Sequence, residues 1–247
     1  MRIDTEFDYW AEMNPGRSIW DAKGSTDPDS TSKSLQAAHQ LLWTKRLPNG
    51  AEFDLRPAQG TQLQWGKLRL GSDSISNSYM TNSRMRQIVL QAQHHAEELF
   101  RCGSKIGAFI LFPSYRVDTK PTINGARGMC LKVGDRMDLT LEAIRRHYVG
   151  EKSPLTDALS RYSEFFDLFV SFKDYVDFWL LNDLVDEQYR VNFFLPFDNF
   201  RRNAPPVDLH EYLQLKSDAT RFLEARTERI GLAPNNSFKP NPLRGSA

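Results

Sequence analysis

Residues 122–150 read TINGARGMCLKVGDRMDLTLEAIRRHYVG and hold a dense group of polar residues that an ordinary fold does not need. Gly125 and Gly128 predict a loop over residues 124–128, because glycine favours irregular backbone. A helix is predicted to follow, with Asp135 as its N-cap and Gly150 as its stop. Its apolar side chains recur at helical spacing: Met137, Leu141, Ile144 and Tyr148.

The polar residues of this stretch predict a pocket for an anion. Glycines on either side of Arg127 would let backbone N–H groups approach a ligand closely. Guanidinium groups bind anions through charge-assisted, forked hydrogen bonds. The predicted ligand-binding residues are Asn124, Arg127, Arg136, Arg145 and Arg146. Neither GxxxxGK[ST] nor GxGxxG is present, so the stretch does not match a known phosphate-binding loop.

The same charges can also be interpreted as an ordinary solvated helix face. Glu142 lies three residues before Arg145 and four before Arg146, where side chains meet on a helix surface. Such exposed pairs contribute only about 0.3–0.5 kcal/mol each. The sequence leaves both interpretations open.

Carboxylates in and near this stretch are candidates for acid–base chemistry. The catalytic candidates are Asp138, Glu142 and Asp177, and Asp73 and Asp198 are further available carboxylates. Asp177 and Asp183 lie in an apolar, aromatic region, and a buried carboxylate needs a partner. We expect the arginines of residues 127–146 to be those partners.

Outside this stretch, hydrophobic spacing predicts helices and strands in an irregular order. Helices are expected over residues 31–45, 83–101, 155–169, 172–185 and 207–230. Strands are expected over residues 3–9, 51–55, 61–70, 106–112 and 190–195, with a turn at 47–50. Because regular βαβ alternation is missing, we predict an α+β fold with a small, mostly antiparallel sheet covered by helices. Residues 1–230 are expected to form a single globular domain and residues 231–247 a disordered tail.

Three smaller features each have a functional and a structural interpretation. His39 falls on a half-apolar helix face, where a histidine is most often a core residue bonded to backbone. Ser72-Asp73-Ser74 follows a strand and could bind a metal or a phosphate, although such a triplet is more often a self-bonded turn. Trp10 and Trp20 are expected to pack onto the body of the protein.

Charge and cysteine content narrow the class of protein. Lys and Arg number 32 and Asp and Glu number 31, which argues against a protein that coats nucleic acid by bulk charge. Cys102 and Cys130 form neither a disulfide framework nor a zinc spacing, and no metal site is predicted. The N-terminus has no secretory pattern, and no apolar run is long enough for a membrane span. We expect a cytoplasmic protein with no membrane contact.

Several motifs resemble those of an uncharacterised bacterial family, a domain of unknown function. They include HQLLWTKRLPNG at residues 39–50, TINGARG at 122–128 and DRMDLTLEAIRRHY at 135–148. Shorter matches are SDS at residues 72–74, YVDF at 175–178, DLV at 183–185 and PFD at 196–198. The resemblance covers most of residues 30–230 and implies no activity or cofactor. Residues 235–247 look similar to short endings of unrelated bacterial reading frames, which would imply a mobile gene cassette.

Three functions follow as hypotheses. The first is a pocket, binding or enzymatic, for a phosphate-bearing partner such as a nucleotide or a nucleic-acid end. The second is an interaction module or homo-oligomer that uses the long C-terminal helix. The third is a nuclease or toxin-like effector carried on mobile DNA. The nearly neutral net charge argues against this third function.

Overall fold

The computed structural model describes residues 3–21, 24–80 and 82–233. Its main sheet has four antiparallel strands in the order β3-β4-β5-β6. These strands are β3 (Arg56–Pro57), β4 (Leu63–Trp65), β5 (Leu68–Ser74) and β6 (Phe109–Pro113). The predicted strand 61–70 is therefore a hairpin rather than one strand. Gly66, with a φ of +55°, makes the turn between β4 and β5.

A second, two-stranded sheet pairs β1 (Lys45–Arg46) with β2 (Glu52–Phe53). The turn between them is the predicted Leu-Pro-Asn-Gly segment. Gly50 has a φ of +85°, and the N–H of Leu47 donates to the carbonyl of Ala51 at 2.8 Å. The predicted turn is therefore confirmed. Glycine suits position 50 because it adopts a positive φ more readily than other residues.

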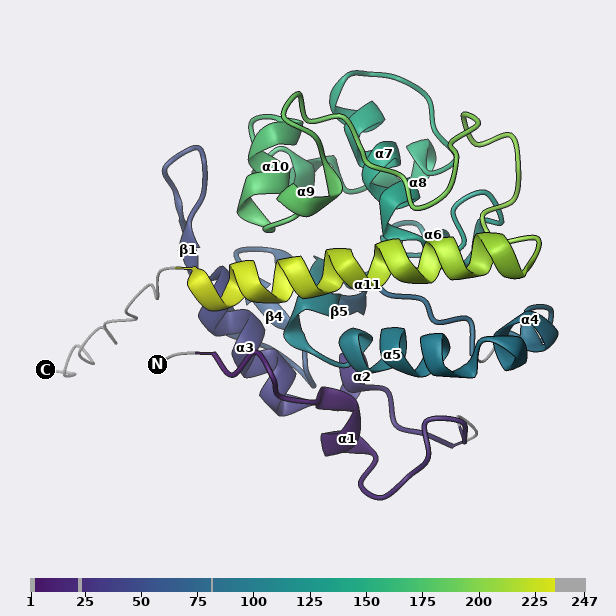
Figure 1. Ribbon diagram of the computed structural model, residues 1–247. Helices are drawn as coiled ribbons and strands as arrows, with labels where there is room; N and C mark the ends of the chain where they lie inside the picture. Colours follow the sequence, from purple (N-terminus) through teal and green to yellow (C-terminus); the bar gives the residue numbers. More distant parts are fainter. Residues whose placement is uncertain (1–2, 22–23, 81, 234–247) are drawn as a thin grey trace, which may run out of the picture.

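The longest helix is α11 (Leu209–Leu232), and it crosses the molecule beside α5 (Gln93–Gly103) and η1 (Ile106–Ala108) (Figure 1). Asp208 caps it by accepting from the N–H of Glu211 at 2.8 Å. Arg226 fastens it to the interior by donating to the carbonyls of Phe109 at 3.0 Å and Trp179 at 3.1 Å. The predicted helix 207–230 is confirmed, and much of it is buried in the body of the protein.

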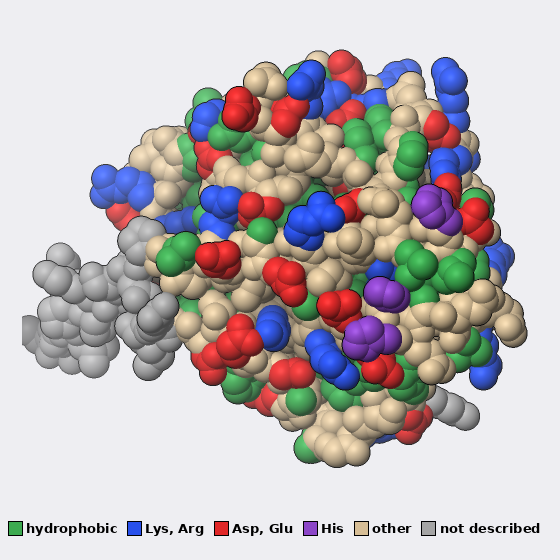
Figure 2. All heavy atoms as spheres, in the orientation of Figure 1, with side chains coloured by type: hydrophobic (Ala, Val, Ile, Leu, Met, Phe, Trp, Pro, Cys, Tyr) green, Lys and Arg blue, Asp and Glu red, His purple; other side chains and the backbone are tan. Residues whose placement is uncertain are grey.

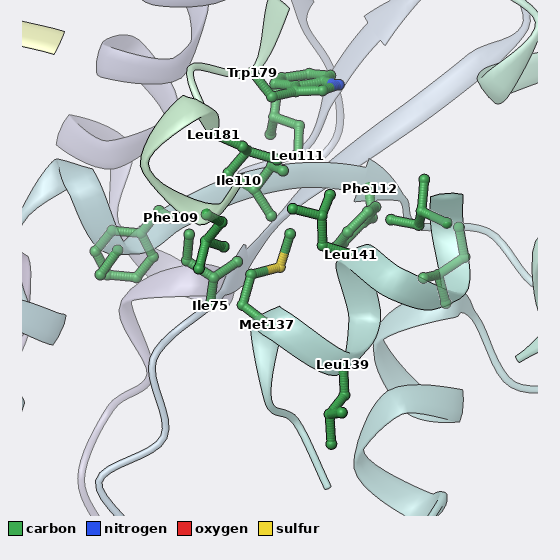
Figure 3. Close-up of a cluster of buried hydrophobic side chains, with 14 of the residues drawn as sticks. Ile75, Phe109, Ile110, Leu111, Phe112, Met137, Leu139, Leu141, Trp179 and Leu181 are labelled. Carbon is green, nitrogen blue, oxygen red and sulfur yellow. The ribbon is translucent and has the colours of Figure 1, made fainter. Parts of the chain in front are cut away.

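The core forms around β6, whose five residues are all buried. Its side chains meet α7 (Met137–Tyr148) and the segment after α10 (Phe172–Phe178), as Figure 3 shows for Ile110, Leu141 and Trp179. The remaining helices of this part of the chain are α8 (Thr156–Ser160), α9 (Ser163–Phe166) and η2 (Asn182–Leu184). Burial on both faces explains why residues 106–112 form an almost uninterrupted apolar run.

The predicted loop over residues 124–128 is wrong, because these residues lie in α6 (Ile123–Met129). Thr122 caps this helix by accepting from the N–H of Gly125 at 3.3 Å, which offsets the low helix propensity of the glycines. Gly128 packs closely against Asp135: a side-chain carbon there would lie 3.1 Å from Oδ2, so the carboxylate would have to move by a few tenths of an ångström. Asp135 itself has a φ of +58°, and the N-cap of α7 is Arg136.

Other predicted elements are shorter or different. Residues 3–9 form a turn that leads into α1 (Tyr9–Met13) instead of a strand, and residues 190–195 contribute one isolated bridge at Val191. The predicted helix 83–101 is two helices, α4 (Arg86–Gln91) and α5, because Ala92 between them has non-helical angles. The predicted helix 31–45 corresponds to α3 (Lys33–Trp43), which Ser32 caps, and a separate short helix, α2 (Pro28–Thr31), precedes it.

The α+β fold class is confirmed: helices cover small antiparallel sheets in a single body. In the described part of the chain, no helix is both long and apolar enough to cross a membrane. Figure 2 shows acidic and basic side chains interspersed over one face of the molecule. The predicted tail begins at residue 231, but residues 234–247 lie outside the described residues.

Candidate functional site

Arg127 lies inside the protein, on α6, with a side chain that is 0% exposed. Its Nη1 pairs with the carboxylate of Asp73 on β5, its Nε donates to Thr140 at 2.9 Å, and its Nη2 donates to the carbonyl of Asp135 at 3.2 Å. Burial raises the pKa of Asp73 to about 6, although the positive charge of Arg127 opposes that shift. An external anion would have to displace these partners to reach the guanidinium.

Arg136 is also buried, and it is paired with a carboxylate two residues away. Its Nε donates to Oδ1 of Asp138 at 3.1 Å, and its Nη1 donates to the carbonyl of Ala204 at 3.0 Å. Oδ2 of Asp138 also accepts from the backbone N–H of Phe194 at 3.0 Å. The Arg136–Asp138 pair therefore joins the start of α7 to two loops, and both oxygens of Asp138 are occupied.

The other predicted arginines share one carboxylate. Glu142 accepts from Nε of Arg145 and from Nε of Arg146, each at 2.8 Å. Arg146 also donates to Oδ1 of Asn199 at 2.5 Å. Asn124 stands apart, exposed on the surface of α6. The five predicted residues are thus placed in three separate ion-pair groups and one exposed amide, and their role in ligand binding stays a prediction.

The acidic candidates Asp177, Asp183 and Asp198 do not meet these arginines. Asp177 accepts from Tyr189 at 2.9 Å and pairs with Lys173, and hydrogen bonds from Lys173, Tyr189 and Asn182 hold its pKa below the usual value against the opposing effect of burial. Asp183 pairs with Arg229 at 2.7 Å. Asp198 accepts from the backbone N–H groups of residues 201 and 202 and so closes a turn. The expectation that arginines 127–146 neutralise Asp177 and Asp183 is wrong, because nearer basic residues do so.

A chain of Ser72, His39 and Asp29 was not anticipated from the sequence. Trp43 Nε1 donates to Nδ1 of His39 at 3.0 Å, Nε2 of His39 lies 3.0 Å from Oγ of Ser72, and that hydroxyl donates to Oδ1 of Asp29 at 2.7 Å. An indole N–H can only donate, so Nδ1 accepts and a neutral ring carries its proton on Nε2. Burial, aided by the charge of Arg226, lowers the pKa of His39 to about 3.

This polarity is the reverse of a hydrolase triad, in which the histidine must accept the serine proton. His39 donates to Ser72 and has no free acceptor for it. Asp29 accepts at both oxygens, because the N–H of Ser74 donates to Oδ2 at 3.0 Å. These hydrogen bonds therefore join α2 and α3 to β5. His39 is a core histidine, but it is bonded to side chains rather than to backbone.

A surface hollow of about 550 Å³ lies at α4, within the usual size range of small-molecule pockets. Its apolar lining residues are Ile19, Trp20, Met80, Val89 and Leu90. Its polar lining residues are Asp21, Asn82, Ser83, Arg86 and Gln93. We call this hollow the α4 groove. It brings together two segments that are far apart in the sequence.

The α4 groove combines exposed apolar surface with an unpaired charge. Trp20 is 37% exposed and Leu90 is 42% exposed, so both contribute apolar surface to the groove. Among the described residues, Arg86 has no hydrogen-bond or ion-pair partner, whereas Asp21 is paired with Arg17 at 3.4 Å. The only sequence signal for this site was Trp20, which was expected to pack onto the body.

Within residues 3–21, 24–80 and 82–233, no three His, Cys, Asp or Glu side chains are placed to hold a metal ion. Comparison with curated proteins and with solved structures found no match. A family model does match: "Family of unknown function (DUF6994)" aligns with residues 3–230. That range contains nearly all of the described residues, including the buried arginine pairs and the α4 groove. The chain therefore belongs to this family of unknown function.

Proposed function

We propose that the chain is a cytoplasmic binding protein for a phosphate-bearing ligand with a planar ring, of the class to which nucleotides belong, and that the α4 groove holds it. One observation carries the proposal: the exposed indole of Trp20 and the unpaired guanidinium of Arg86 line the same hollow. Asn82 and Gln93 add amide groups that suit the polar edge of a ring.

The chemistry of the two principal residues supports this ligand class. A guanidinium presents five N–H donors that match phosphate oxygens, and Arg86 has all of them available within the described structure. An exposed indole offers a flat face, and base–aromatic stacking contributes about 1–3 kcal/mol per base. Because Arg17 neutralises Asp21, the remaining charge of the described lining is positive. This complements an anion rather than a cation.

The arginines of α6 and α7 support the fold in this proposal. Arg127 and Arg136 already bind carboxylates in the interior, and removing a buried charge partner is expensive. A ligand at the α4 groove leaves those pairs intact. The proposed site therefore differs from the location that residues 122–150 predicted, while the ligand class is the same.

The test is a binding panel by thermal shift and calorimetry with AMP, GMP, CMP, UMP, the matching nucleosides and inorganic phosphate. A nucleotide at 100 times its dissociation constant is expected to stabilise the protein by roughly 2.7 kcal/mol. Arg86→Ala should weaken nucleotide binding by about 10- to 100-fold, because charged hydrogen bonds contribute about 1.5–3 kcal/mol. Nucleosides should bind more weakly than their monophosphates.

Arg84→Ala is the matched control, because Arg84 is exposed two residues away and does not line the groove. Its affinity should stay within about twofold of the unmodified protein if the effect is local rather than long-range. Equal losses in the Arg84 and Arg86 variants would refute the site. Absence of any shift at millimolar nucleotide would refute the ligand class.

A further inference from the structure

The Trp20 indole, which lines the α4 groove, forms a hydrogen bond to a residue of α5. Nε1 of Trp20 donates to Oε1 of Glu97 at 2.8 Å, across 77 residues of sequence. Glu97 lies on α5 one turn after Gln93, which lines the groove, so both point to the same side of that helix. Glu97 itself is not a lining residue.

The segment that carries Trp20 also contains hydrogen bonds between its own residues. Asn14 donates to the carbonyl of Thr26 at 2.8 Å and accepts from its N–H at 2.7 Å, and Arg17 donates to the carbonyl of Gly24 at 2.8 Å. These bonds shape the loop but do not orient the indole against α4 and α5. The Trp20–Glu97 bond does, because it joins the ring itself to α5.

We propose that Glu97 is a positioning residue that fixes the Trp20 indole as the aromatic wall of the α4 groove. The inference rests on the proposed function for the identity of the ligand. The positioning of Trp20 by Glu97 can be tested without any ligand. A wall held in place in the free protein loses little side-chain freedom on binding, which strengthens affinity. The bond also leaves the flat faces of the indole available, since it uses only the ring edge.

Two variants at one position separate the hydrogen bond from the charge. Glu97→Gln keeps a carbonyl oxygen that can accept from the indole, whereas Glu97→Ala keeps none. Both remove the same negative charge, so any electrostatic effect on an anionic ligand is shared. Arg101→Ala removes the other partner of Glu97, at 3.7 Å, and leaves Oε1 free to accept.

The ligand-independent measurement is the indole N–H spectrum of the free protein by ¹⁵N NMR, with the Trp20 signal identified by Trp20→Phe. Glu97→Ala should shift the Trp20 signal upfield and give it the relaxation of a mobile side chain. Glu97→Gln and Arg101→Ala should leave it ordered. An unchanged, ordered Trp20 signal in Glu97→Ala would overturn the proposal even if no nucleotide binds.

The ligand-dependent measurement is the affinity for AMP and GMP. Glu97→Ala should weaken binding by about tenfold, while Glu97→Gln should stay within about twofold. In a Trp20→Phe background, Glu97→Ala should have only the charge effect that it shares with Glu97→Gln, because phenylalanine cannot donate to Glu97. An equal loss in that background would show that Glu97 acts by another route. If Trp20 is mobilised but nucleotides do not bind the unmodified protein, the proposed function fails and the positioning role remains.

Discussion

The guanidinium of Arg127 pairs with the carboxylate of Asp73, and the side chains are 0% and 7% exposed. Residue 127 lies on α6 and residue 73 on β5, so the pair joins a helix to the main sheet. The ring of Phe112 lies 5.8 Å from the guanidinium carbon, so β6 also contacts the cation. An ion pair enclosed in this way is sensitive to the loss of either partner.

Arg127→Ala should therefore destabilise the protein by about 3–5 kcal/mol, because it leaves the buried Asp73 without its counter-charge. Urea denaturation at pH 7 measures this as a lower midpoint with an unchanged slope. Arg84→Ala, an exposed arginine, should change stability by less than about 0.5 kcal/mol. If Arg127→Ala lowered the free energy of unfolding by less than about 1 kcal/mol and also abolished ligand binding, Arg127 would be a ligand-binding residue instead.

His39 should remain neutral at pH values well below 6.5, because burial lowers the pKa of its ring to about 3. ¹⁵N NMR of the imidazole should show a proton on Nε2 and none on Nδ1, since Trp43 donates to Nδ1. A His39 signal that titrates between pH 5 and 8 would contradict the assigned polarity.

This neutral histidine also has a consequence for stability. The unfolded chain binds a proton at His39 below about pH 6.5, whereas the native state does so only near pH 3. Stability is therefore lost at this site as the pH falls from 6.5 towards 3, because the unfolded state holds more protons there. His39→Gln should reduce this acid sensitivity while lowering stability at pH 7, since glutamine cannot reproduce both hydrogen bonds.

Lys216 on α11 carries a buried amine that has no hydrogen-bond partner within the described structure. Its Nζ lies 5.7 Å from the centre of the Tyr212 ring, and burial lowers its pKa from 10.5 to about 7, against the opposing effects of Cys102 and Glu98. Between these pH values the unfolded chain binds a proton that the native state does not. Stability should therefore rise with pH from about 7 to 10.5 at this site.

Lys216→Met should remove that slope and stabilise the protein at pH 7 by about 1–4 kcal/mol, because methionine fills similar space without a charge. Urea denaturation at pH 7 and pH 9.5 gives both quantities. Lys67→Met is the control, since Lys67 is exposed and should show neither effect. Lower stability of the Lys216 variant at both pH values would mean that the amine has a stabilising partner, such as an ordered water.

Local signals in the sequence predicted the elements that depend on local physics. The stripe of Met137, Leu141 and Ile144 identified α7, and the apolar run before Pro113 identified β6. The loop prediction at residues 124–128 failed because two glycines outweighed Thr122, a capping residue that in fact starts α6. Breaks such as that at Ala92 depend on packing and leave no mark on hydrophobic spacing.

Partners across long sequence separations could not be predicted in this way. The arginines of residues 122–150 are prominent in the sequence, but nothing local indicates that Asp73 neutralises Arg127 or that Ala204 accepts from Arg136. The α4 groove needs residues near 20 and near 86 side by side, and the fold alone brings them together. An arginine that is buried and paired supports the fold, whereas an exposed and unpaired arginine can bind a ligand. Burial depends on the tertiary structure, so the sequence alone does not show it.

Gly107 marks the closest approach of η1 to α11, and it supplies a last test of the fold. A side-chain carbon at position 107 would lie 2.9 Å from the carbonyl oxygen of Leu223 and 3.0 Å from the backbone N of Thr227, and it would overlap the Thr227 hydroxyl. Gly107→Ala should therefore destabilise the protein by about 1–3 kcal/mol in urea denaturation. Adding Thr227→Ala should recover only part of that loss, because the two backbone contacts remain. Full recovery in the double variant would mean that the hydroxyl alone limits the approach of α11, and that its backbone can move away from η1 at little cost.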